Sequence, residues 1–140
     1  MGDLTTNFSL SEFLNKNDYG PTFKTKTPKA ELVATLQALR DEIKMAIGIE
    51  SGIRSVEHNK SVGGAASSAH LMGEAADIYV TGMKNTTLGR IIRVMYNQGR
   101  LPYLAYTYLI KGTSNTRVHV GVDLHVKRNS VFGDGYEKIA

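Results

Sequence analysis

The chain has 140 residues, of which 41% are hydrophobic and 21% are charged, a composition that is typical of a globular protein and argues against a disordered one. It contains no cysteine, which excludes disulfides, thiolate metal sites and a cysteine nucleophile, so any metal must be held by histidine and carboxylate side chains. The formal net charge of +4 favours anionic partners only weakly.

No apolar run approaches the roughly 18 residues that span a bilayer, and residues 1–10 lack the basic and apolar segments of a secretory signal. We therefore expect a protein that is made in the cytoplasm and does not insert into membranes. The length fits one domain over residues 1–140. The sequence leaves the oligomeric state open.

The first predicted helix begins in the segment "FSLSEF". Ser9 can cap this helix, and Glu12 three residues later can complete a capping box. Phe8 and Phe13 are spaced to pack on each other as a hydrophobic staple. We expect a short helix that ends before "NDYGP".

Two longer helices are predicted from apolar residues spaced three and four positions apart. The first has Thr27 as its cap and Pro28 at its first position, and Gly48 closes it. The second runs from about Thr87 to Gln98. The apolar positions are Leu32, Leu36, Leu39, Ile43 and Ile47 in the first, and Leu88, Ile91, Ile92, Met95 and Tyr96 in the second.

Four segments rich in β-branched or aromatic residues predict strands: 48–54, 76–80, 103–110 and 118–126. The last alternates strictly, so its valines and Leu124 are expected to face the core, whereas His119, Gly121, Asp123 and His125 face the other way. Only a short loop separates the last two strands, which predicts antiparallel pairing. The predicted fold class is α+β, with helices packed on an antiparallel sheet.

A histidine and an aspartate seven residues apart, His70 and Asp77, could converge on one zinc ion, since Gly73 lets the chain turn between them. His119 is the best third ligand, because the opposite face of its strand is core. His125 lies on the same face but roughly 20 Å farther along at ~3.3 Å per residue. Spacing alone is a weak signal, because a half-exposed histidine on a strand is more often structural.

The segment "SAHLMGEAAD" fits the pattern S-x-H-x-x-G-x-A-x-D and resembles the M15 peptidases, a group of zinc D-Ala-D-Ala carboxypeptidases and murein endopeptidases. The segments "NFSLSEF", "SGIRSVEHNKSVGG" and "VHV" match in the same order, so the resemblance runs from about Phe8 to Val126. It implies a D,D-peptidase-like (hedgehog-like) fold and one Zn2+ held by His70, Asp77 and His119.

The resemblance also implies that Arg54 steadies the substrate or transition state and that Ser68 lines the substrate cleft. The alternative interpretations are that Arg54 forms a surface salt bridge and that Ser68 is an ordinary loop serine. The implied reaction is amide hydrolysis in peptidoglycan stem peptides, whose carboxylates suit the planar fork of an arginine. The sequence does not distinguish a carboxypeptidase from an endopeptidase. The missing export signal fits a phage-type endolysin that reaches the cell wall after release.

The general base is the point at which the chain departs from the family pattern. Many relatives carry an acid three residues before the last histidine ligand, where this chain has Thr116, and others carry one two residues after it, where it has Gly121. Asp123 is expected about 13 Å along the strand from His119, beyond direct reach of a metal-bound water.

Three residues near the expected cleft remain as candidates for the base: Glu74, which we take as the predicted base, Glu57 and His58. The missing family acid leaves a second class open, namely a catalytically silent zinc-containing module that binds murein or has a structural role. A nucleic-acid binder ranks last, because no basic stripe is flanked by aromatic residues. We therefore expect no nucleic-acid partner.

Overall fold

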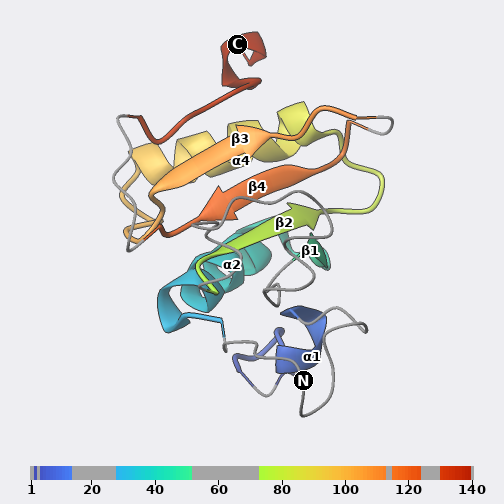
Figure 1. The fold of residues 1–140 in the computed structure, drawn as a ribbon, viewed down its shortest axis with the longest axis vertical. Coiled ribbons are helices and arrows are strands. Elements are labelled where there is room, and N and C mark those ends of the chain that lie inside the picture. The colour runs from blue at the N-terminus through green and yellow to red at the C-terminus, as the bar shows by residue number, and fades with distance from the viewer. Residues whose placement is uncertain are drawn as a thin grey trace, which may run out of the picture.

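The computed structural model describes residues 2, 4–13, 28–51, 73–112, 115–123 and 130–139. The helices are α1 (Leu10–Phe13), α2 (Ala30–Ile43), α4 (Asn85–Asn97) and the 3₁₀ helix η2 (Tyr136–Lys138). The strands are β1 (Gly48–Ser51), β2 (Ala75–Tyr79), β3 (Tyr106–Leu109) and β4 (Val118–Gly121). Their arrangement confirms the predicted α+β class (Figure 1).

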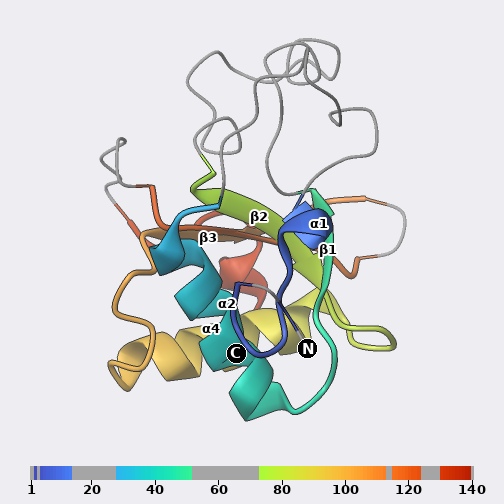
Figure 2. The same ribbon diagram turned by 90° about the horizontal axis from the view of Figure 1, so that it is seen from below.

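The four strands form one antiparallel sheet in the order β1-β2-β4-β3. The chain passes from β2 through α4 to the edge strand β3 and then returns as β4 between them. Figure 2 shows α2 and α4 on the same side of this sheet. The opposite face of the sheet is therefore not covered by either long helix.

The hydrophobic core lies between the sheet and the two long helices. Alternate residues of the central strands point into it, among them Ile78, Val118 and Val120, each with no exposed surface. Helix α2 contributes Leu36 and helix α4 contributes Ile92, both fully buried. Burying each such side chain stabilises the fold by about 1.5–3 kcal/mol. None of the helices in the described part of the chain is long and apolar enough to cross a membrane.

Helix α1 has the local contacts that its sequence predicts. The Glu12 carboxylate accepts the Ser9 backbone N–H at 2.7 Å, which is one half of a capping box. The rings of Phe8 and Phe13 pack with their centroids 6.4 Å apart, and both side chains are buried. The predicted staple is thus confirmed, and it attaches this short helix to the core.

The predicted helix over residues 87–98 is confirmed as α4, but the predicted end of α2 is wrong. Helix α2 stops at Ile43 because Lys44 adopts a left-handed conformation with φ 61°. Gly48 instead begins β1, where a Cβ would lie 2.2 Å from the Tyr79 ring. A side chain at residue 48 would therefore have to displace the Tyr79 ring. Lys29 occupies the N-cap position, and Thr27 lies outside the described residues.

The last predicted strand is also shorter than its alternating sequence indicates. The burial of Val118, Val120 and Val122 confirms the predicted core face. However, β4 ends at Gly121, opposite the first residue of β2, and Asp123 has a left-handed φ of 38°. The ladder stops here because its neighbour begins here, so a continuous strand through residue 123 is wrong. Residues 124–126 lie outside the described part.

A buried tyrosine joins the C-terminal segment to the sheet. The Tyr136 hydroxyl and the Thr107 hydroxyl are 2.9 Å apart, and both side chains are almost completely buried. Burial raises the pKa of the Tyr136 phenol to about 12, because the phenolate would lose its hydration.

This tyrosine predicts a loss of stability in alkali. The pKa is higher in the folded than in the unfolded chain, so the folded state is favoured fully below pH ~10 and loses this contribution as the pH rises towards 12. We expect the free energy of unfolding to fall by up to about 3 kcal/mol over this range. Urea denaturation of the unmodified protein and of Tyr136→Phe at pH 9, 10 and 11 measures it. An equally steep fall of the free energy of unfolding in Tyr136→Phe would assign the effect to other titrating groups.

Candidate functional site

A histidine and an aspartate from neighbouring strands meet on the sheet face away from the long helices. Asp77 of β2 and His119 of β4 are directly opposite in the antiparallel register. His119 Nδ1 lies 2.9 Å from Asp77 Oδ1, and the two side chains are 7% and 15% exposed. The next residues along each strand point into the core, so alternation fixes this pair on the other face.

Two tyrosines of β3 extend this row across the sheet. Tyr108 pairs with His119 in the register, and their rings stack with centroids 4.6 Å apart and planes 14° apart. Tyr106 approaches the same imidazole edge-on at 6.2 Å. Stacking restricts rotation of the His119 ring. These two tyrosines were not among the predicted site residues, although the alternation of "YTYL" places them on one face.

Asp123 lies beside His119, contrary to the expected separation of about 13 Å. Its Oδ1 is 2.5 Å from the position that a Cβ would take at Gly121, and His119 Nε2 is 3.4 Å from that same position. The expectation was wrong because it assumed an extended strand, whereas the chain turns at Asp123. The Asp123 side chain is 5% exposed, so the site contains a second buried acid.

Glu74, the predicted base, is fully buried at the start of β2. Gly73 before it has φ 70°, and the Glu74 carbonyl accepts the Val122 N–H at 2.8 Å. This bond places Glu74 at the same end of the sheet as Asp123. Because strand residues alternate, Glu74 shares the side of Ala76 rather than that of Asp77. Its carboxylate can reach the His119 face only around the end of the strand.

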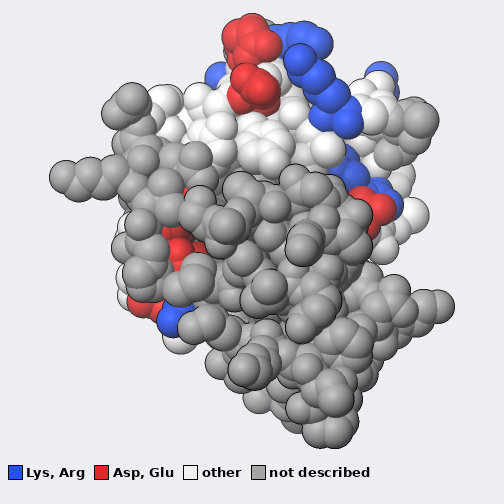
Figure 3. Space-filling model, in the orientation of Figure 1, with Lys and Arg blue, Asp and Glu red and all other residues white. Residues whose placement is uncertain are grey.

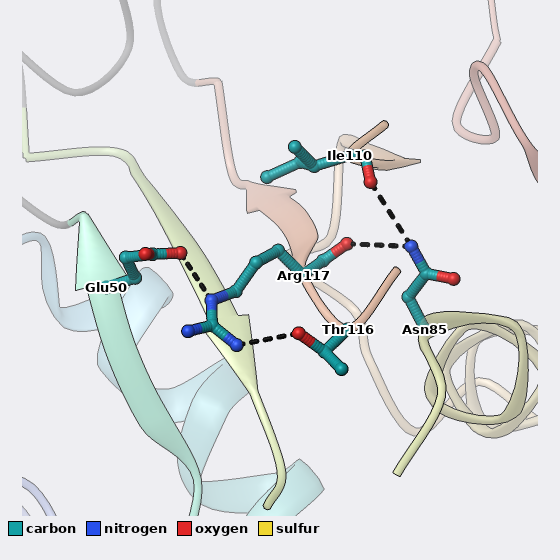
Figure 4. A network of polar contacts seen from close by, with 5 residues as sticks. All are labelled: Glu50, Asn85, Ile110, Thr116 and Arg117. Carbon is teal, nitrogen blue, oxygen red and sulfur yellow. Dashed lines mark hydrogen bonds and ion pairs between the residues drawn. The ribbon is translucent and has the colours of Figure 1, made fainter. Parts of the chain in front are cut away.

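Thr116, at the position of the family acid, belongs to a separate polar network (Figure 4). Its hydroxyl accepts Nη1–H of Arg117 at 2.7 Å, and Arg117 also pairs with Glu50 and lies 3.9 Å from the centre of the Tyr79 ring. Asn85 donates to the Arg117 carbonyl at 3.3 Å. The Arg117–Glu50 pair is partly exposed, so it contributes less than about 1 kcal/mol.

Several predicted site residues lie outside the described residues: Arg54, Glu57, His58, Ser68, His70 and His125. The structure brings together Asp77 and His119 from the predicted ligand set. Within the described ranges, no group of three or more metal-ligating side chains is found. The third ligand and the substrate-binding residues therefore remain predictions.

The Asp77–His119 pair has the donor atoms of a zinc site. Zinc accepts imidazole nitrogen and carboxylate oxygen, and a catalytic site commonly combines three protein ligands with one open position. Here a nitrogen and an oxygen converge to 2.9 Å on a largely buried surface. Hydrogen bonding alone can also account for the pair, so the relationship of the chain to known families bears on its function.

The comparisons with known proteins supply that relationship. A family model described as Peptidase M15 matches residues 6–120, a range that contains both Asp77 and His119. The comparison with curated proteins finds no match. Because the family model covers most of the sequence, the chain belongs to the Peptidase M15 family.

Proposed function

We propose that this chain is a zinc-dependent peptidase that hydrolyses amide bonds in peptidoglycan stem peptides. The convergence of Asp77 and His119 in a chain of the M15 family is the observation that supports this most directly. His70 would complete the ligand set. The donors are two imidazoles and one carboxylate, a combination that suits Zn2+ and leaves a position for water.

When bound, zinc would polarise the scissile carbonyl and lower the pKa of a bound water. The residues of the chain would supply the remaining functions. Asp77 and His119 would hold the ion, and the stacked Tyr108 would restrict rotation of the His119 imidazole. Arg54 would bind a substrate carboxylate or the developing oxyanion, and Ser68 would line the cleft. Glu74 would accept the proton of the attacking water.

We further propose a phage-type endolysin role on the bacterial cell wall. The substrate bond is either a terminal D-alanine linkage or an internal bond such as a cross-link, and both stem-peptide substrates carry carboxylates. Digestion of purified murein by the zinc-loaded protein, followed by mass spectrometry of the products, distinguishes them. Free D-alanine identifies a carboxypeptidase, and conversion of cross-linked muropeptides into uncross-linked ones identifies an endopeptidase. Intact murein after prolonged digestion contradicts the peptidase proposal.

Arg54→Lys is expected to lower the rate of murein hydrolysis about tenfold, because an ammonium keeps the charge but lacks the bidentate fork. The melting temperature should change little if the arginine faces substrate. Initial rates and thermal melts of both proteins measure these effects. Full turnover combined with a lower melting temperature would assign Arg54 a structural role instead.

The second candidate is a silent zinc-containing murein-binding module. It is favoured by Thr116, which stands at the position of the family acid and is engaged by Arg117. Zinc and murein binding without peptide release would establish this alternative. We do not propose a nucleic-acid binder. On the face in Figure 3, the cationic side chains of described residues are interspersed with acidic ones.

A further inference from the structure

A cationic side chain lies on the same face of the sheet as the Asp77–His119 pair. Val118 is fully buried in the core, so its neighbours Arg117 and His119 lie on the opposite face. Tyr79 shares this face with Asp77, because strand residues alternate. The guanidinium carbon of Arg117 lies 3.9 Å from the centre of the Tyr79 ring. Arg117 and Tyr79 therefore form a row beside that of His119 and Asp77.

Three contacts hold the Arg117 guanidinium in place, two of which are drawn in Figure 4. Nε–H is donated to the Glu50 carboxylate, Nη1–H is donated to the Thr116 hydroxyl at 2.7 Å, and the Tyr79 ring packs against the cation. Within the described residues, Nη2 has no hydrogen-bond partner. The Arg117 side chain is 28% exposed, so part of this oriented cation is open to solvent.

We propose that Arg117 binds a carboxylate of the stem peptide beside the scissile bond, an inference that rests on the proposed peptidase function. Two residues of a strand span about 7 Å, so Arg117 lies this far along the sheet from His119. An extended substrate covers the same distance with about two residues. Glu50 and Thr116 use only part of the N–H donors of the guanidinium, and those that remain suit a carboxylate. Arg117 would thus select substrates with an acidic group near the bond that is cut.

Glu50 distinguishes substrate binding from a purely structural ion pair. In a structural pair, loss of either partner has the same consequence, because each acts only through the other. If Arg117 binds substrate, the Glu50 carboxylate repels the substrate carboxylate and competes with it for the cation. Glu50→Gln keeps an oxygen that accepts Nε–H but removes this negative charge. We therefore expect Glu50→Gln to lower the KM for an acidic stem peptide and Arg117→Gln to raise it.

Synthetic stem peptides and the zinc-loaded protein test these opposite shifts. Arg117→Gln should raise KM by about tenfold or more with little change in kcat, because a charge-assisted hydrogen bond is lost away from the reacting bond. Arg117→Lys should give a smaller increase, since the ammonium keeps the charge but lacks the planar fork. The matched control is Arg100→Gln, which breaks another partly exposed ion pair, with Glu42, and should leave KM unchanged.

Peptides in which each carboxylate is amidated in turn give a second readout. One amidation should weaken binding to the unmodified protein by about tenfold and have no effect on Arg117→Gln. Calorimetric Kd values for the same peptides apply the test even if the zinc-loaded protein cleaves none of them, so failure of the peptidase proposal is seen separately. An unchanged KM and Kd in a folded Arg117→Gln would overturn the inference. So would equal increases in Glu50→Gln and Arg117→Gln, or binding to the unmodified protein that no amidation weakens.

Discussion

Substitution of His119 by alanine is expected to abolish stoichiometric zinc binding and to lower the rate of murein hydrolysis by more than about a hundredfold. Loss of a residue that only hydrogen-bonds to a metal ligand already costs up to about a hundredfold. His119 would contribute one of three protein ligands, and its loss leaves Asp77 without the nitrogen that lies 2.9 Å away. Metal analysis and initial rates measure both effects. Asp77→Ala and His70→Ala should behave in the same way.

A matched control separates ligand loss from general damage. Asp134→Asn removes an exposed acid and should keep one zinc per chain. Undiminished zinc in any of the three ligand variants would remove that residue from the site. A melting temperature close to that of the unmodified protein, measured without metal, shows that the fold persists.

The sequence predicted which side chains share a face better than it predicted where elements end. Alternation over residues 118–122 was sufficient to assign Val118 and Val120 to the core and His119 to the opposite face, because the strand period is two. The partner of His119 was not derivable from that pattern. It depends on the register that pairs β2 with β4 and sets Asp77 directly opposite.

The position of Asp123 could not be predicted from the strand pattern for a related reason. The alternating residues give no sign that β4 ends at Gly121, since this end is set by where β2 begins. A left-handed aspartate then turns the chain and returns its carboxylate towards His119. Likewise, α2 ends at the left-handed Lys44, before Gly48, the residue that was predicted to end it. In both cases a non-glycine residue adopts a conformation that glycine usually provides.

Glu74→Gln is expected to lower turnover by roughly a hundredfold or more if Glu74 is the general base, because the amide cannot accept the proton of the attacking water. The structure makes this a demanding test. Glu74 is fully buried just before the first residue of β2 and shares the side of Ala76, so its carboxylate must pass around the start of the strand to serve the His119 face.

The measurement compares turnover, zinc content and melting temperature of Glu74→Gln with those of Glu57→Gln, His58→Gln and Asp123→Asn on intact murein at saturating zinc. A Glu74→Gln protein that retains zinc and melts normally but turns over far more slowly than the other variants establishes the base. A lower melting temperature with full turnover per folded molecule gives Glu74 a structural role in the buried strand end. The proton must then pass to another acid or to a carboxylate of the stem peptide, because the Thr116 hydroxyl cannot serve as a base and is engaged by Arg117.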